Sequence, residues 1–125
     1  MESALNSCLV IDDSRVIRVV ARRILETLGM RVSEAADGAE ALAMCREDMP
    51  DAVLLDWSMP VMNGFEFLAH LRAEPGGDRV RVVFCSVEDD LAFIGEALAR
   101  GADEYVIKPF DAEILATKLA LAGAA

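Results

Sequence analysis

The sequence predicts an α/β protein built on one parallel sheet with helices on both faces. Short apolar runs alternate along the chain with longer segments of helical periodicity, which is the pattern of repeated βα units. Several of the short runs are apolar at consecutive positions, as in strands buried on both faces. The chain has 125 residues, 54% of them hydrophobic, which suits a single domain with a sizeable core.

Five strands and five helices are expected in alternation. The strands are the apolar runs at residues 7–11, 31–35, 52–56, 81–85 and 104–108. The helices are the periodic segments at residues 15–28, 39–47, 64–73, 88–100 and 111–121. Of the strands, the run RVSEA at 31–35 has the weakest signal. The chain shows no linker, low-complexity tract or second domain.

The first two βα units have clear boundaries. The run SCLVI is followed by a helix with one apolar face. The residues of that face recur at helical spacing and are Ile17, Val20, Ala21, Ile24, Leu25 and Leu28. Gly29 then supplies a C-cap. In the second unit Asp37 and Gly38 mark the turn before a short helix, which Pro50 closes.

The third and fourth units follow the same order. The run AVLLD leads to the helix GFEFLAHLRA, and the loop EPGGD separates this helix from the run RVVFC. In the helix at 88–100 we expect Leu91, Ile94 and Leu98 to form the buried stripe, with Phe93 off it. Gly95 in its middle costs about 1 kcal/mol relative to Ala, which weakens this helix.

The fifth unit joins the run EYVIK to a helix that is apolar on two sides, whereas a surface helix normally has one apolar stripe. Leu115, Leu119 and Ala122 form one stripe, and Ile114 and Leu121 form the other. Two interpretations of the second stripe stay open. It is either a patch for a partner or a second copy of the chain, or a face around which the core wraps.

Composition excludes several classes of function. The formal net charge of −10 disfavours direct nucleic-acid binding and suits a metal ion or a basic protein patch. No apolar run approaches the roughly 18 residues of a membrane span, and MESALNS is unlike a signal peptide. We therefore expect a soluble cytoplasmic protein without membrane insertion. Cys8, Cys45 and Cys85 form no CxxC motif and are expected to be free, buried thiols.

Polar side chains stand where four of the five predicted strands end. Asp12 and Asp13 follow the first strand, Asp56 ends the third, Ser86 follows the fourth and Lys108 ends the fifth. Each of them alone is typical of a turn or a helix cap. Together they predict one site, because ligands of an open parallel sheet bind beyond the carboxyl ends of its strands.

These residue types suit phosphoryl transfer. Three neighbouring carboxylates repel one another unless a cation or a proton compensates. Mg²⁺ suits an all-oxygen site, and the lack of Cys and His at these positions argues against zinc. A carboxylate can then attack a phosphorus atom while the metal ion and the ammonium group of Lys108 neutralise the phosphoryl oxygens.

Four stretches resemble the receiver domain of two-component response regulators. They are VIDDSRVIR, DAVLLDWSMPVMNGFEFL, VVFCSVED and GADEYVIKPFD, and the resemblance extends over roughly residues 6–121. It implies a single receiver domain over residues 1–125, without an output domain. The implied fold is flavodoxin-like and CheY-like, with five βα units and the strand order 2-1-3-4-5. Stand-alone CheY-like chemotaxis regulators are the members it resembles most.

The resemblance implies a role for most polar residues of the predicted site. Asp56 matches the phosphoacceptor, and Asp12 and Asp13 match the acidic pair that binds Mg²⁺ together with Asp56. The backbone carbonyl of Ser58 matches a further ligand of the metal ion, for which Mn²⁺ is an alternative. Lys108 matches the lysine that pairs with the phosphoryl group.

The resemblance also implies a switch. Ser86 matches the residue whose hydroxyl bonds the phosphoryl group, and Tyr105 matches the aromatic residue that rotates inward when Ser86 is recruited. The peptide bond between Lys108 and Pro109 is expected to be cis, a conformation largely confined to proline.

Some residues depart from the family pattern or have an open role. Ser58 stands where Asn is common, and Val87 stands where Ala or Gly is common, which leaves the lifetime of the phosphoryl group open. Val87 is expected to slow loading from small phosphodonors. Trp57 either packs the loop or lies over the site as a reporter. His70 is expected at the surface, without a phosphotransfer role.

The resemblance implies a signalling protein rather than an enzyme. A histidine kinase would donate the phosphoryl group to Asp56, and the only catalysis would be self-phosphorylation and slow autodephosphorylation. The face made by the helix at 88–100, the strand at 104–108 and the last helix would then bind a downstream protein such as a flagellar motor component. The protein would be a monomer or a weak dimer that depends on phosphorylation.

Several alternatives share these residues or this architecture. The same chemistry serves a phosphorelay intermediate, a phosphate sink or a cell-cycle adaptor. An aspartyl-phosphate hydrolase of the haloacid dehalogenase type also uses Asp, Mg²⁺ and Lys, but its nucleophile follows the first strand in a DxDxT motif, which DDSRV lacks. A flavodoxin-like flavin binder needs a phosphate loop after the first strand, where Asp12 and Asp13 would repel the phosphate.

Overall fold

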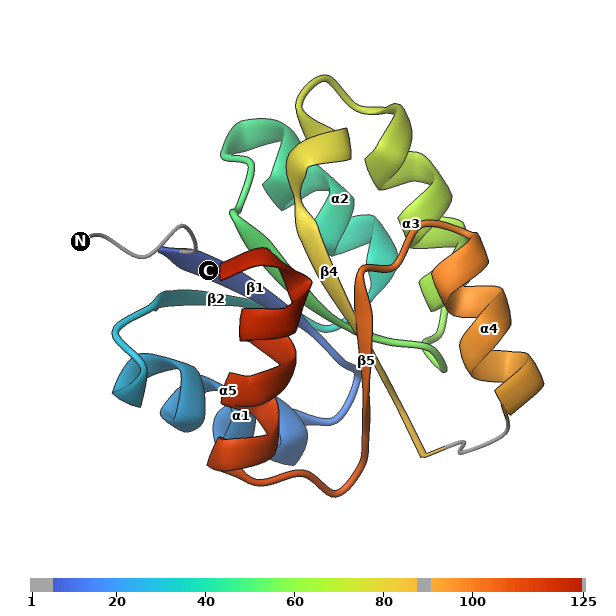
Figure 1. Cartoon of the computed structure of the whole chain (residues 1–125). Helices are drawn as coiled ribbons and strands as arrows, with labels where there is room; N and C mark the ends of the chain where they lie inside the picture. The colour runs from blue at the N-terminus through green and yellow to red at the C-terminus, as the bar shows by residue number, and fades with distance from the viewer. Residues whose placement is uncertain (1–5, 88–90, 125) are drawn as a thin grey trace.

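The computed structural model describes residues 6–87 and 91–124, which form one five-stranded parallel sheet between two layers of helices (Figure 1). The strands are β1 (Ser7–Ile11), β2 (Arg31–Ala35), β3 (Ala52–Asp56), β4 (Arg81–Ser86) and β5 (Glu104–Ile107). Their order in the sheet is β2-β1-β3-β4-β5. The predicted fold class and strand order are confirmed.

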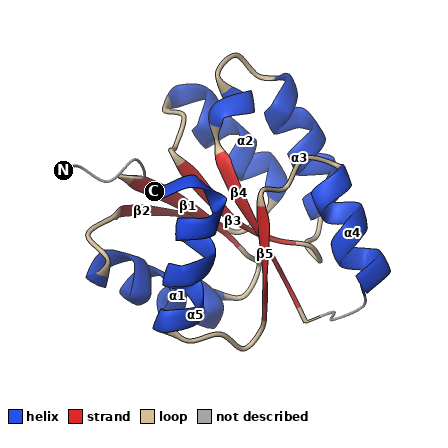
Figure 2. Cartoon of the chain, in the orientation of Figure 1, coloured by secondary structure: helices blue, strands red, loops and turns tan. Residues whose placement is uncertain are grey.

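Helices cover both faces of the sheet. They are α1 (Arg15–Thr27), α2 (Gly38–Glu47), α3 (Gly64–Ala73), α4 (Leu91–Ala99) and α5 (Ala112–Leu119), with a 3₁₀ turn at Gly77–Arg79 and a π-helical turn at Ala120–Ala124. Figure 2 shows α1 and α5 on one face and α2, α3 and α4 on the other. The predicted element ends are right to within a few residues. Residues 88–90 of the fourth predicted helix lie outside the described residues.

The core consists of two apolar layers, one on each face of the sheet. Successive side chains of a strand point to opposite faces, so each central strand contributes to both layers. The layer under α2, α3 and α4 includes the strand residues Leu9, Ile11, Val53, Leu55, Val82 and Phe84. The layer under α1 and α5 includes Cys8, Val10, Leu54, Val83, Cys85 and Val106. All three cysteines are free and buried, as predicted.

Helix caps fix how the chain leaves the strands. Ser14 is the N-cap of α1, and its hydroxyl accepts from the backbone N–H of Ile17. The N-cap of this helix is therefore neither Asp12 nor Asp13. Asn63 and Glu66 form a reciprocal capping box at the start of α3.

Two predicted helix faces differ from the structure. In α1 the buried residues are Ala21 and Leu25, whereas Val20 and Leu28 are 42% and 43% exposed. The apolar face was therefore predicted too wide, because one side of α1 faces solvent.

The predicted buried stripe of α4 is confirmed at Ile94 and wrong at Leu91 and Leu98. Leu91 is 82% exposed and Leu98 is 40% exposed, while Ile94 and Ala97 are buried. Phe93, predicted off the stripe, packs against the core. The helix is rotated because the aromatic ring of Phe93 joins a cluster of rings above β4, which outweighs the burial of two leucines.

The second apolar stripe of the last helix is exposed. Leu115, Leu119 and Ala122 are buried, as predicted, while Ile114 and Leu121 are 44% and 66% exposed. The core therefore does not wrap around this helix. None of the helices that the structure describes is long and apolar enough to cross a membrane.

Candidate functional site

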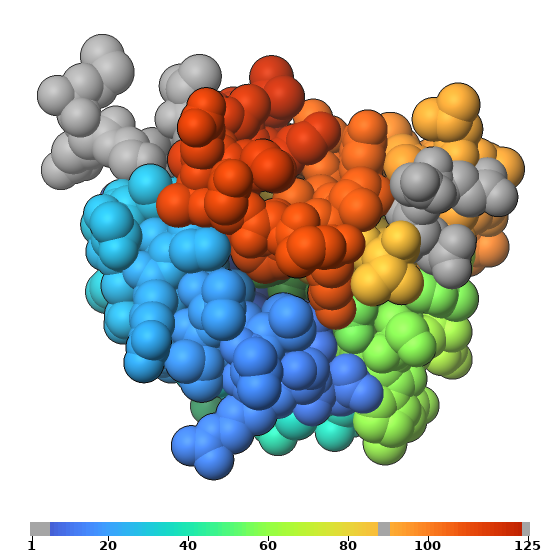
Figure 3. All heavy atoms as spheres, turned by 90° about the horizontal axis from the view of Figure 1, so that it is seen from below, coloured from blue at the N-terminus to red at the C-terminus, as the bar shows by residue number. Residues whose placement is uncertain are grey.

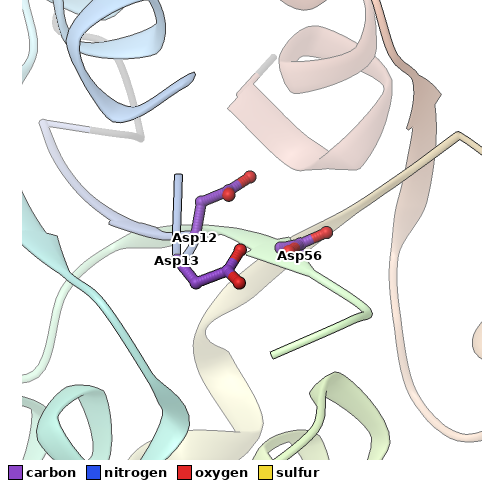
Figure 4. A group of neighbouring side chains, drawn as sticks. All are labelled: Asp12, Asp13 and Asp56. Carbon is purple, nitrogen blue, oxygen red and sulfur yellow. The ribbon is translucent and has the colours of Figure 1, made fainter. Parts of the chain in front are cut away.

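Three carboxylates meet at the carboxyl ends of β1 and β3. Asp12 and Asp13 directly follow β1, and Asp56 is the last residue of β3. One carboxylate oxygen from each residue lies within 4.8 Å of the other two (Figure 4). Asp12 and Asp56 are only 2% and 6% exposed, whereas Asp13 is exposed. The parallel pairing of β1 with β3 brings these groups to one edge of the sheet.

Lys108 joins the two buried carboxylates. Its Nζ atom donates to Oδ2 of Asp12 at 2.8 Å and to Oδ1 of Asp56 at 3.1 Å. Oδ1 of Asp12 accepts from the backbone N–H of Ser14 at 2.9 Å. Asp12 is therefore held by the protein through both of its carboxylate oxygens.

Charge is unbalanced in this cluster, where three carboxylates face the ammonium group of Lys108. Burial raises the pKa of the Asp56 carboxyl above its ordinary value and the charge of Asp12 raises it further, while Lys108 opposes both. Burial lowers the pKa of Lys108, but its hydrogen bond to Asp12 and the nearby negative charges outweigh burial, so the pKa is raised overall. Lys108 is thus a fixed cation, and ionised Asp56 gains from any further cation.

An open cleft of about 390 Å³ gives access to the cluster. It is lined by Asp13, Asp56, Trp57, Ser58, Ser86, Val87 and Lys108. Figure 3 shows the face on which the blue segment after β1, the green segment after β3 and the orange-red segment after β5 meet. Val87 is 72% exposed, so its side chain borders the cleft without closing it. Of the predicted site residues, Asp13, Asp56, Ser58, Ser86 and Lys108 line this cleft, and Pro109 directly follows Lys108 in the chain. Asp12 and Tyr105 are not among the lining residues.

The loop between β3 and α3 is held tightly against the end of β3. The N–H of Gly64 donates to the carbonyl of Trp57 at 2.9 Å. A Cβ atom added at Gly64 would lie 2.7 Å from the carbonyl oxygen of Asp56, so only glycine fits there. Val61 has a φ of 69°, and the N–H of Met62 donates to the carbonyl of Pro60 at 2.7 Å across it, which forms a γ-turn.

Trp57 connects the cleft to the helices. It lines the cleft, and its ring lies 4.7 Å from the ring of Phe65 in α3 and 5.3 Å from the ring of Phe93 in α4. Trp57 therefore packs the loop against α3 and α4 and also borders the cleft, while its role as a reporter stays a prediction.

The remaining predicted site residues lie on β4, β5 and the turn after β5. Ser86 is 6% exposed, and its carbonyl accepts from the N–H of Lys108 at 2.9 Å. The Lys108–Pro109 peptide bond is cis. Tyr105 is half-buried, and Nζ of Lys118 in α5 lies 4.1 Å from the centre of its ring. His70 is exposed on α3, as predicted.

The donor set fits a hard divalent cation. The cluster offers carboxylate oxygens only, which Mg²⁺ and Ca²⁺ prefer, and it offers no nitrogen or sulfur ligand. Mg²⁺ keeps several waters and needs few protein ligands, so an open cleft beside two or three carboxylates suits it. Asp13 and Asp56 line the cleft and are available to such an ion, whereas Asp12 is held by Ser14 and Lys108.

Sequence reasoning missed Arg18. Its Nη1 atom donates to the backbone carbonyl of Asp12 at 2.7 Å, and its Nε atom donates to Glu34 at 3.1 Å. In the sequence, the only sign of this contact was Glu34 in the weak second strand. A glutamate at a solvent-exposed edge of the sheet would give the same sign.

Comparison with known proteins places the chain among signalling proteins. The family model described as the response regulator receiver domain matches residues 8–120. A response regulator named MprA from Mycobacterium ulcerans is 39% identical over 111 residues, which are 89% of this chain and 47% of that protein. The chain thus spans about half the length of the curated relatives it matches.

Solved structures of similar proteins have the same fold. The chemotaxis response regulator CheY4 of Vibrio cholerae has a TM-score of 0.89 at 33% identity, over 94% of this chain and 98% of that one. CheY of Borrelia burgdorferi, solved in a complex with CheX, BeF₃ and Mg²⁺, has a TM-score of 0.85 at 26% identity, over 91% of this chain and 86% of that one.

Proposed function

The chain belongs to the response regulator receiver domain family, and on this premise we propose that Asp56 accepts a phosphoryl group from a histidine kinase in a reaction that requires Mg²⁺. The observation that carries the proposal is the convergence of Asp12, Asp13 and Asp56 with Lys108 at one open edge of the sheet. Mn²⁺, with the same preference for oxygen ligands, can take the place of Mg²⁺.

In the proposed transfer step, each atom that reacts can be named. A carboxylate oxygen of Asp56 attacks the phosphorus of a phosphohistidine, so that a P–O bond forms, the P–N bond breaks and the imidazole nitrogen leaves with the electron pair. The attack requires ionised Asp56, whose pKa is raised by burial and by Asp12. Mg²⁺, when bound, supplies positive charge that favours the ionised carboxylate and neutralises the phosphoryl oxygens.

Other residues of the cleft would hold the transferred group. Lys108 lies 3.1 Å from Asp56 and can turn its ammonium group from the carboxylates to a phosphoryl oxygen. Ser86 lines the same cleft at the end of β4, where its hydroxyl can donate to a second oxygen. The backbone carbonyl of Ser58 is the proposed third protein ligand of the ion, after Asp13 and Asp56.

The chain would act as a phosphoacceptor and not as a turnover enzyme. The acyl phosphate on Asp56 would be lost by slow autodephosphorylation, at a rate to which Ser58 and Val87 at the cleft rim contribute. Tyr105 is the proposed switch, a half-buried residue of β5 whose ring contacts Lys118 of α5.

The proposed output is a change in affinity for a protein partner. Exposed apolar side chains lie on α4 and along the last helix, including Leu91, Leu98, Ile114 and Leu121. A contiguous exposed apolar patch marks a protein-binding surface, and we propose that these side chains contribute to one. The likeness to a chemotaxis regulator supports a partner such as a flagellar motor component, and the same surface serves a phosphorylation-dependent dimer.

The test is phosphorylation of the wild type and of the Asp56→Asn variant by a histidine kinase, with Mg²⁺ and with chelator. We expect one added phosphoryl group by intact mass only in the wild type and only with Mg²⁺. The Asp78→Asn variant, whose side chain is exposed in the 3₁₀ turn, is the matched control and should be labelled normally. Labelling of the Asp56→Asn variant would refute the assignment. A pull-down of motor proteins by the phosphorylated chain then separates chemotaxis from a relay or phosphate sink.

A further inference from the structure

A guanidinium group lies directly behind the acidic cluster. Arg18 is the fourth residue of α1, and its side chain is 17% exposed. Its Nη1 atom donates to the backbone carbonyl of Asp12 at 2.7 Å, which is short for such a bond. Hydrogen bonds from an ionised donor are among the stronger ones in proteins.

The position of Arg18 is fixed by a second bond. Its Nε atom donates to Oε1 of Glu34 at 3.1 Å, and Glu34 lies on β2. Oε2 of Glu34 accepts from Nε of Arg22 at 2.6 Å, so one carboxylate holds two arginines of α1. The guanidinium group of Arg18 is thus anchored on the sheet before it reaches Asp12.

Asp12 and Asp13 form an acidic turn after β1. The backbone carbonyl of Asp12 belongs to the peptide unit that leads to Asp13. The backbone N–H of Asp12 donates to the carbonyl of Ala35 at 3.1 Å, and its carboxylate is held by two donors. Asp13 is exposed and lines the cleft. Because a peptide unit is planar, fixing the carbonyl oxygen of Asp12 also fixes the N–H and Cα of Asp13.

We propose that Arg18 is a positioning residue of the cation site, which acts through the Asp12 carbonyl to hold Asp13 in the orientation that binds the metal ion. The inference rests on the proposed function, because it presumes that a divalent cation binds Asp13 and Asp56. Groups that orient metal ligands typically change metal affinity by 10–100-fold when they are removed. We expect about a tenfold weaker affinity for Mg²⁺ without Arg18, at the lower end of that range.

Electrostatics alone predicts the opposite sign. Arg18 carries a positive charge near a cation site, and its removal also leaves Glu34 with one counter-ion fewer. Without a positioning effect, the loss of this charge would strengthen Mg²⁺ binding or leave it unchanged. The direction of the change therefore separates positioning from charge.

Arg22 provides a matched control. It lies one helical turn further along α1, pairs with the same carboxylate of Glu34, and also pairs with Glu26 at 3.3 Å. Among the residues that the structure describes, its guanidinium group bonds Glu34 and Glu26 and not the acidic turn, so the Arg22→Ala variant removes the same kind of charge without touching Asp12.

The experiment is calorimetric titration of the full chain with MgCl₂ for the wild type and the Arg18→Ala, Arg18→Lys and Arg22→Ala variants, with circular dichroism to show that each is folded. We expect about tenfold weaker binding for Arg18→Ala, partial recovery for Arg18→Lys, and a change of less than about threefold for Arg22→Ala. The Arg18→Gln variant, which keeps one donor, replaces Arg18→Ala if that variant does not fold.

Two outcomes contradict the inference in different ways. Equal or tighter binding by Arg18→Ala, or an equal loss in Arg22→Ala, refutes positioning while the cation site stands. Failure of the wild type to bind Mg²⁺ refutes the cation site and thereby the proposed function as well.

Discussion

We predict that the Asp56→Asn substitution raises the free energy of unfolding at neutral pH in the absence of divalent cations. Asp56 is 6% exposed, and its carboxylate oxygen lies within 4.8 Å of those of Asp12 and Asp13. Such a residue is costly to keep ionised, and burial is the larger cause of its raised pKa, followed by the charge of Asp12.

The magnitude follows from opposing terms. At an effective dielectric constant of about 20, the attraction of Lys108 at 3.1 Å is worth about 5 kcal/mol. The repulsion between the carboxylates of Asp56 and Asp12, at up to 4.8 Å, offsets about 3.5 kcal/mol of this attraction. Asp13 offsets only a little more, because its exposed carboxylate acts through solvent. Desolvation of a buried carboxylate costs several kcal/mol, and an amide oxygen can still accept from Lys108. We therefore expect a gain of about 2 kcal/mol for the variant.

The gain in free energy of unfolding of the Asp56→Asn variant should increase as the pH rises. Since the pKa of Asp56 in the folded state is raised above its ordinary value of 3.8, the stability it contributes is present below that value and is lost as the pH rises through the folded pKa. The asparagine does not titrate, so the difference between variant and wild type should be smallest below about pH 4 and largest at neutral pH.

Urea unfolding with chelator at neutral and acidic pH measures both effects. The matched control is Asp51→Asn at the opposite end of the same strand, where the carboxylate accepts from the N–H groups of Asn6 and Ser7. That variant should lose about 1–2 kcal/mol, because its donors lose a charged acceptor. Mg²⁺ at 100 times its dissociation constant should stabilise the wild type by about 2.7 kcal/mol and reverse the order with Asp56→Asn. An Asp56→Asn variant that is less stable than the wild type at neutral pH, or a difference that is constant with pH, would refute the reasoning.

Four further substitutions test the parts of the fold that surround the site. Val61→Gly should raise the free energy of unfolding by about 1 kcal/mol, because a β-branched residue is strained at a φ of 69°, and a lower urea midpoint would contradict this. Gly64→Ala should lose about 2 kcal/mol or more in thermal unfolding, because its Cβ would meet the Asp56 carbonyl, whereas Gly95→Ala in the exposed middle of α4 should gain about 1 kcal/mol. Phe93→Ala should cost about 2 kcal/mol and shift the emission of the neighbouring tryptophan, and an unchanged spectrum would contradict their contact.

The fold could be predicted from the sequence because its strands are buried on both faces. The apolar runs VLLD and VVFC can only be central strands, and their helical connections require parallel pairing. The orientation of α4 could not be predicted in this way. Its sequence LAFIGEALA is apolar on several sides, so periodicity allowed more than one buried face. The choice depended on where the rings of Trp57, Phe65 and Phe84 would lie, which is a property of three other elements.

The candidate site was predictable to the extent that topology alone determines it. In a parallel sheet every strand ends at the same edge, so the topology brings Asp12, Asp56 and Lys108 to that edge. The donors that orient these groups obey no such rule. Arg18 reaches Asp12 only because β2 places Glu34 beside α1, and that distance depends on the tertiary fold. The residues proposed to react are therefore recognisable from strand ends, whereas those proposed to position them become visible only when side chains from separate elements are seen together.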